Sequence, residues 1–183
     1  LAAGLAMSLA TRRFRRELQP RDGFLLVGLT WAVLPAFGAL ALLLQIPGLS
    51  FTDAYFEAMS GFTATGATAL TDIEAVDSSL LMWRQLTQWL GGMGIIVLAV
   101  AILPLLGVGG SQVFKAETPG PMKDTKLTPR ITQTAKILWL VYGAMTGLCI
   151  VAYRIAGMNW FDATVHAFST LALGGFSSYD ASF

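Results

Sequence analysis

Apolar residues dominate three long stretches of the chain, and polar residues gather between them. Residues 23–46 include no charged side chain and would make about 36 Å of α-helix at ~1.5 Å per residue. Two further apolar stretches cover about 83–106 and 135–156. Because about 20 apolar residues cross the hydrocarbon core of a bilayer, this pattern predicts three membrane-spanning helices.

Two shorter stretches follow the first and third of these helices. Residues 51–61 and 159–169 are moderately apolar, and about 16 Å of helix would reach only halfway through a bilayer. Each leads into a loop of small residues, at 62–68 and 171–177. The pattern therefore predicts two half-length helices that enter the membrane and turn back.

Positive charge sets the expected orientation of the chain. Arginines cluster before the first apolar stretch, and lysines and prolines fill the link before the third, so the positive-inside rule places both segments in the cytoplasm. The division that we expect is the end of a preceding membrane helix at 1–10, a basic cytoplasmic link at 11–22, a helix, pore-loop, helix unit at 23–106, a cytoplasmic connection at 107–134, and a second unit, as far as its loop, at 135–183. The expected fold class is an all-α membrane protein.

The two units repeat in sequence. A shift of 109 residues without a gap superposes eight identities over the 29 positions from Gly38 to Gly66. The identical pairs are Gly38 and Gly147, Ile46 and Ile155, Gly48 and Gly157, Asp53 and Asp162, Ala54 and Ala163, Ala58 and Ala167, Ser60 and Ser169, and Gly66 and Gly175. Both half-helices are expected to enter from outside, so the repeat is parallel, and parallel copies surround an axis along the membrane normal.

Such loops suit a cation. Non-helical backbone is tolerated at membrane depth only where it is buried in protein or lines a watery cavity. Carbonyl oxygens around one axis can replace the hydration shell of a cation, and the C-terminal ends of the half-helices carry partial negative charge. A competing interpretation treats glycines such as Gly66 and Gly175 as helix C-caps.

Four segments carry a resemblance to a known family: residues 60–68 (SGFTATGAT), 88–97 (QWLGGMGIIV), 116–123 (AETPGPMK) and 174–177 (GGFS). Together they resemble the bacterial Trk/Ktr potassium-uptake family, in particular its Trk-type membrane subunits. The resemblance implies four pore-loop units in one polypeptide of the bacterial inner membrane, and a homodimer with a cytoplasmic nucleotide-binding regulatory subunit. Because the chain starts at Leu1 and ends at Phe183, just after a glycine-rich loop, we expect it to be part of a longer polypeptide.

The same resemblance assigns the site. It implies a potassium filter at Thr63, Ala64, Thr65, Gly66, Leu173, Gly174, Gly175 and Phe176. The carbonyl oxygens of Ala64, Thr65, Leu173 and Gly174 would bind the ion, which is cargo rather than a cofactor, and no cofactor is expected. Ala64 stands where threonine is frequent in the family, and Leu173 where another aliphatic residue is common, but neither change removes a carbonyl.

Polar residues outside the loops receive structural roles. Asp53 and Asp162 lie early in the half-helices, where carboxylates can bind free amides; attraction of cations is the alternative. Glu57 and His166 share a repeat position, so a local partner is expected for each. We assign no transport role to Arg84, Arg154 and Gln88, which are expected to snorkel or to form hydrogen bonds near the outer interface.

Composition limits the other functions. The chain is 55% hydrophobic and 13% charged with a net charge of +1, so its natural surroundings are lipid, and no basic field favours nucleic acid. Cys149 is the single cysteine and is expected to pack. No phosphate loop, paired carboxylate or Ser/His/Asp set indicates an enzyme. Two alternatives remain: a permease that binds a small solute at broken helices, which repeat orientation would distinguish, and an assembly subunit whose loops only pack.

Overall fold

The computed structural model describes residues 11, 20–102 and 127–181, and all regular secondary structure in this part of the chain is helical. The predictions for 1–10, for most of 11–22 and for 103–126 lie outside the described residues. The elements are α2 (Pro20–Gln45), α3 (Phe51–Phe62), a 3₁₀ turn η1 (Ile73–Ala75), α4 (Ser78–Ile102), α6 (Leu127–Ile155) and α7 (Trp160–Ala172).

The chain forms two compact units, Leu1–Thr30 and Trp31–Phe183. In the first unit, the described residues are Thr11 and the beginning of α2, where the Thr30 hydroxyl donates to the carbonyl oxygen of Leu26 at 2.7 Å. The second unit holds the rest of α2, the other helices and both loops. All contacts described below lie within this second unit.

The five predicted helical segments are present, but their boundaries differ from the hydropathy pattern. The helix α4 begins at Ser78 rather than near 83, because Asp77 provides an N-terminal cap: its carbonyl oxygen accepts from Leu80 and Leu81, and its carboxylate accepts from Ser79 at 2.8 Å. These hydrogen bonds from Ser79 lower the pKa of Asp77. Hydropathy marks where a helix becomes apolar, whereas the cap marks where it begins.

Two described helices are long and apolar enough to cross a membrane, at Phe24–Gln45 and Gln133–Ile155. The helix α4 has 25 residues and is therefore also long enough at ~1.5 Å per residue. One side of α6 is apolar and open, with Leu140, Leu148 and Ile155 each at least two-thirds exposed. A surface of this kind is stable against lipid.

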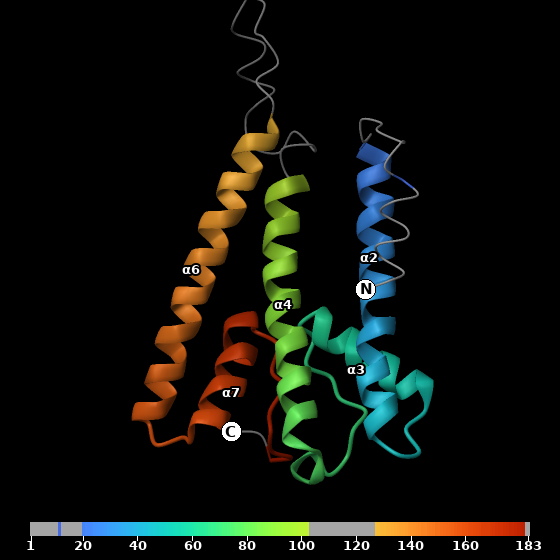
Figure 1. The fold of residues 1–183 in the computed structure, drawn as a ribbon, viewed down its shortest axis with the longest axis vertical. Coiled ribbons are helices and arrows are strands. Elements are labelled where there is room, and N and C mark those ends of the chain that lie inside the picture. The colour runs from blue at the N-terminus through green and yellow to red at the C-terminus, as the bar shows by residue number, and fades with distance from the viewer. Residues whose placement is uncertain (1–10, 12–19, 103–126, 182–183) are drawn as a thin grey trace, which may run out of the picture. The chain divides into compact units, whose positions relative to one another are not determined.

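The half-helices turn back as the sequence predicts. In Figure 1, α7 folds back beside α6 and ends well short of the far end of that helix. The helix α4 contacts α3, α6 and α7. It therefore forms the shared wall between the two half-helices.

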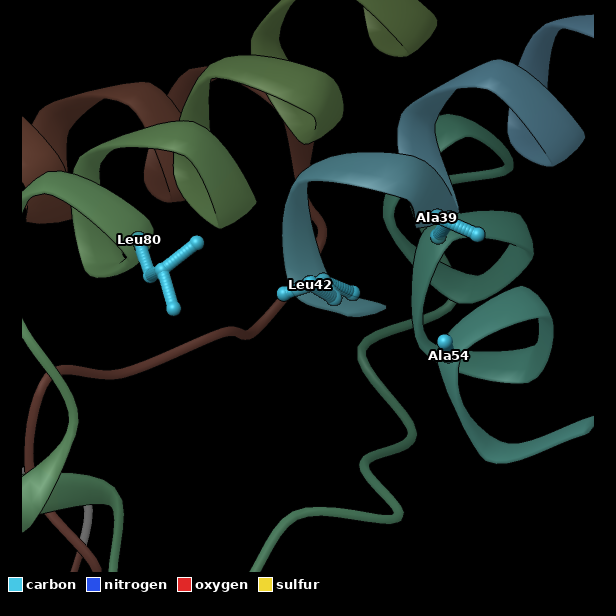
Figure 2. Packing of buried hydrophobic residues seen from close by; sticks show 5 residues of the cluster. Ala39, Leu42, Ala54 and Leu80 are labelled. Atoms are coloured by element: carbon cyan, nitrogen blue, oxygen red, sulfur yellow. The ribbon is translucent and has the colours of Figure 1, made fainter. Parts of the chain in front are cut away.

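Buried apolar side chains hold α2, α3 and α4 together. Figure 2 shows Ala39 and Leu42 of α2, Ala54 of α3 and Leu80 of α4 in one buried cluster. The indole nitrogen of Trp83 donates to the carbonyl oxygen of Gly38 at 3.1 Å. This packing fixes the start of the first half-helix against its neighbours.

Glycines of α4 permit close approaches at two of three positions. A Cβ built on Gly91 would collide with the backbone oxygen of Phe62, and one built on Gly92 would lie 3.0 Å from the Cα of Ala172. The same atom on Gly94 would meet only the Trp31 ring, at 3.8 Å. Gly91 is therefore required for this packing, Gly92 leaves little room for a side chain, and Gly94 has space for one.

We predict that Gly91→Ala destabilises the protein by about 1–3 kcal/mol, because the methyl group overpacks against fixed backbone. Gly94→Ala is the matched control, for which the better helix propensity of alanine favours an unchanged or higher melting temperature. Thermal unfolding of the complete protein in detergent measures both. Equal melting temperatures would contradict the packing role of Gly91.

Candidate functional site

Both half-helices begin with the same cap. The side chains of Ser50 and Asn159 accept from the backbone N–H groups of Asp53 and Asp162, at 3.1 and 2.8 Å. Each carboxylate in turn accepts from the side chain of its capping residue. The prediction that the carboxylates themselves bind the free amides is therefore wrong, because a residue three positions earlier already does so.

Both half-helices also end in the same way. Thr65 N–H donates to the carbonyl oxygen of Ser60, and Gly174 N–H donates to that of Ser169, each at 2.9 Å. These are the hydrogen bonds of a Schellman motif. The left-handed residue that such a motif needs is not a glycine here, but Ala64 after α3 and Leu173 after α7, with φ of 52° and 56°.

The glycines of the loops lie two residues further on. Gly66 and Gly175 have φ of 78° and 83°, in a region that side chains other than glycine rarely adopt. Because the capping positions are already occupied by other residues, the C-cap interpretation of these glycines is wrong. Positive φ recurs at a spacing of 109 residues in three pairs: Gly48 and Gly157, Ala64 and Leu173, and Gly66 and Gly175.

The two loops meet and run in the same direction. A Cβ built on Gly66 would collide with the carbonyl oxygen of Gly174 and would lie 3.4 Å from the Cα of Gly175. Three contacts connect the loops and the segments that follow them. Gly66 lies against Gly174, Arg84 bridges Thr68 and Ser177, and the N–H of Ile73 binds Asp180. The residue numbers increase in the same order on both sides of these contacts, so the two loops run in the same direction and the repeat is parallel.

The remaining predicted filter residues differ in their surroundings. Leu173 is 89% exposed, whereas Phe176 is 2% exposed. The hydroxyls of Thr63 and Thr65 bind each other at 2.7 Å. A Cβ built on Gly175 would meet no atom within 4 Å. The structure thus joins the two loops at their glycines and directs the Phe176 ring into the protein.

Gln88 of α4 supports the second loop from behind. Its Oε1 accepts from the backbone N–H of Phe176 at 3.3 Å, and its amide group lies directly against Gly174. The nearby Gln85 is fully buried, and neither its Oε1 nor its Nε2 has a hydrogen-bond partner among the described residues. Gln88 therefore has a specific backbone partner that Gln85 lacks.

Glu57 and His166 occupy equivalent positions, and each holds an equivalent hydroxyl. The carboxylate of Glu57 accepts from Thr68 Oγ1 at 3.0 Å and from the N–H of Ala69 at 2.9 Å. His166 Nε2 lies 3.4 Å from Ser177 Oγ. Thr68 and Ser177 are themselves 109 residues apart. The prediction of a local partner for each residue is confirmed.

Arg84 joins the two loops. Its Nε and Nη2 bind the carboxylate of Glu57 at 2.8 and 2.6 Å, and both side chains are at most 2% exposed. Nη2 also donates to Thr68 Oγ1 at 3.3 Å, while Nη1 donates to the carbonyl oxygen of Ser177 at 3.4 Å. The guanidinium carbon lies 4.2 Å from the centre of the Phe176 ring. Of the two expected alternatives, Arg84 forms hydrogen bonds and does not snorkel, whereas Arg154 is exposed and contacts Trp160.

The segment after the second loop is tied back to the start of α7. Asp162 accepts from Ser178 Oγ at 3.2 Å and from the hydroxyl of Tyr179 at 2.7 Å. The hydrogen bond to Asp162 raises the pKa of the Tyr179 phenol. The carboxylate of Asp180 accepts from the N–H of Ile73 at 3.0 Å. Both ends of the loop are therefore fixed.

Sequence reasoning did not predict which residues hold the loops: Arg84, Gln88, Thr68 and Ser177. One signal could have found Arg84. Charged residues within membrane segments usually pair with one another, and Glu57 and Arg84 are opposite charges on two segments that the apolar pattern places in the membrane. Thr68 and Ser177 could have been found by extending the repeat beyond Gly66. They are not identical residues, but both carry a hydroxyl group at equivalent positions.

Chemically, the loops offer backbone oxygen atoms. Ala64, Leu173 and Gly174 have no side-chain ligand atoms, so their carbonyl groups are the available ligands for a cation. Both loops follow the C-terminal ends of half-helices, whose partial negative charge favours a cation. Two parallel re-entrant loops of this kind are the arrangement of a pore-loop membrane protein.

Comparison with known proteins agrees with this class. The family model described as "TrkH: Cation transport protein" matches residues 2–183. The chain is 57% identical over 183 residues to the Trk system potassium uptake protein TrkH of Halomonas elongata. The aligned region covers all of this chain and 38% of that protein. It is 44% identical over 173 residues to TrkG of Escherichia coli, covering 94% and 36% of the two chains.

A solved structure is also similar. The crystal structure of the potassium transporter TrkH from Vibrio parahaemolyticus superposes with a TM-score of 0.79 at 46% identity, covering 97% of this chain and 35% of that chain. The chain therefore belongs to the TrkH family of cation transport proteins, and it spans somewhat over a third of the length of these relatives.

We predict that Gln88→Leu lowers the stability of the complete protein by about 1–3 kcal/mol, because the buried N–H of Phe176 loses its acceptor. Gln85→Leu is the matched control. It replaces a buried amide without a partner among the described residues, so the melting temperature is expected to stay or to rise. If Gln85→Leu destabilises the protein as much as Gln88→Leu does, the distinction between the two glutamines is wrong.

Proposed function

We propose that the protein moves potassium across the membrane through a filter of backbone carbonyl groups. Ala64, Thr65, Leu173 and Gly174 supply the carbonyls, and Gly66 and Gly175 allow the backbone to turn. The observation that carries the proposal is the meeting of two loops with the same backbone conformation, in parallel, at Gly66 and Gly174. Thr63 and Phe176 complete the filter segments as flanking residues.

The choice of potassium rests on the relatives. The similar proteins of Halomonas elongata and Escherichia coli are named potassium uptake proteins, and the similar crystal structure is titled a potassium transporter. Backbone carbonyl rings are the means by which potassium filters replace the hydration shell. Potassium is the substrate in this proposal, and the protein needs no further cofactor and performs no enzymatic step.

The parallel loops also favour a pore over the alternative permease. Many permeases bind solutes between inverted repeats, in which contacts between equivalent loops would run in opposite directions. Here they run together from Gly66 and Gly174 to Ile73 and Asp180. In the third interpretation, an assembly subunit, the loop glycines would affect folding but not ion selectivity.

The surroundings follow from the same proposal. A protein of this kind would be a multi-pass protein of the bacterial inner membrane, in contact with lipid along faces such as that of α6. We further propose a homodimer that binds a cytoplasmic nucleotide-binding regulatory subunit, as the resemblance to the Trk/Ktr family implies. Size-exclusion chromatography with light scattering tests the dimer.

The central test is cation flux through the complete protein in liposomes, with potassium, rubidium and sodium compared. We predict that Gly66→Ser lowers the potassium-to-sodium permeability ratio by about 5- to 30-fold, since a side chain in the left-handed region costs roughly 1–2 kcal/mol and would also collide with Gly174. Gly175→Ser has the same backbone strain but open space around the Cβ, so we expect a smaller decrease in the potassium-to-sodium permeability ratio.

Gly143→Ser serves as the control, because a Cβ there meets no atom within 4 Å and the residue lies in α6, away from the loops. It should keep the parental ratio. If the parent protein moves no monovalent cation, the pore is wrong and the solute permease takes precedence. If Gly66→Ser folds and keeps the parental ratio, the loops are not the filter.

A further inference from the structure

One buried cation lies behind both loops. Among the described residues, one carboxylate, that of Glu57, pairs with the guanidinium of Arg84, and the two residues are 2% and 1% exposed. Arginine stays charged in proteins, so this site cannot relieve its burial by losing a proton. The charge of Arg84 is therefore a fixed feature that the surrounding groups must satisfy.

The groups that satisfy it belong to different parts of the chain. Glu57 lies in the first half-helix and Thr68 in the loop that follows it, whereas the Ser177 carbonyl and the Phe176 ring belong to the second loop. Arg84 itself lies in α4, between the two loops in sequence. One rigid, planar group thus contacts both loops at once.

The two points that it contacts are equivalent. Thr68 and Ser177 each lie two residues beyond the loop glycine, and each is held by the residue at the Glu57 or His166 position. A shift of Arg84 would therefore change the spacing of the two loops at matched positions. Closer to the half-helices along both loops, the next contact between the loops is that of Gly66 with Gly174.

We propose that Arg84, held by Glu57, is a positioning residue that sets the spacing between the two filter loops and thereby determines ion selectivity. This inference rests on the proposed potassium filter. Arg84 does not touch the ion but acts through the backbone at Ser177 and the hydroxyl of Thr68. Lysine cannot replace it, because an ammonium group lacks the planar fork that reaches several acceptors and stacks on a ring.

The experiment uses the complete protein in liposomes, with melting temperature and the potassium-to-sodium permeability ratio measured for each variant. Single removal of either charge leaves its partner buried and unpaired, so those variants are expected to fold poorly. Two variants avoid this difficulty. Arg84→Lys keeps the charge balance, and the double variant Glu57→Gln with Arg84→Met removes both charges while keeping similar side-chain volumes.

For both variants we expect a folded protein whose permeability ratio falls by about tenfold, equivalent to about 1.4 kcal/mol of discrimination. Tyr142→Phe is the control: it removes the hydrogen bond from the Tyr142 hydroxyl to the carbonyl oxygen of Trp89, which joins α6 to α4 and does not involve the loops. It should lower the melting temperature without changing the ratio.

The outcomes separate this inference from the proposed function. If the parent is selective and Gly66→Ser reduces its selectivity, while both Arg84 variants keep the parental ratio or fail to fold, then the filter stands and the positioning role is overturned. If Tyr142→Phe alters the ratio as much as Arg84→Lys does, loss of stability explains both, and the positioning role is again overturned. If the parent moves no monovalent cation, both proposals fail.

Discussion

Backbone groups at membrane depth have no water to bind, and this constraint shapes the whole arrangement around the loops. A re-entrant loop leaves N–H and carbonyl groups that a helix would have paired within itself. Here side chains pair with them instead, because the N–H of Ala69 binds Glu57, that of Phe176 binds Gln88, and the carbonyl of Ser177 binds Arg84. Glu57 of α3 and Arg84 and Gln88 of α4 thus satisfy backbone groups that the loops leave unpaired.

The repeat preserves backbone geometry more strictly than side-chain chemistry. Left-handed positions and helix caps recur at the same spacing in both copies of the sequence repeat. Yet the residue that holds the loop hydroxyl is the carboxylate of Glu57 in the first copy and the imidazole of His166 in the second. Once the backbone path is fixed, any buried polar group that satisfies the hydroxyl is sufficient.

Much of the fold could be predicted from the sequence, because hydropathy and length determine which segments cross the membrane and which turn back. The half-helices and their parallel repeat follow from those two properties and from the spacing of 109 residues. The filter assignment comes from the resemblance and remains a prediction. The contacts of Arg84 and Gln88 with the second loop could not be read from the sequence, because Ser177 and Phe176 lie 93 and 88 residues away from them.

That separation has a consequence for the order in which the site is assembled. The partners of the first loop are near in sequence: Thr68 is 11 residues from Glu57, and Arg84 is 27 residues from it. The first loop can therefore close while the chain is still being synthesised. The second loop needs side chains made some 90 residues earlier, and closing so long a segment is slow. The contact between the two loops is therefore completed only at this late step of biogenesis.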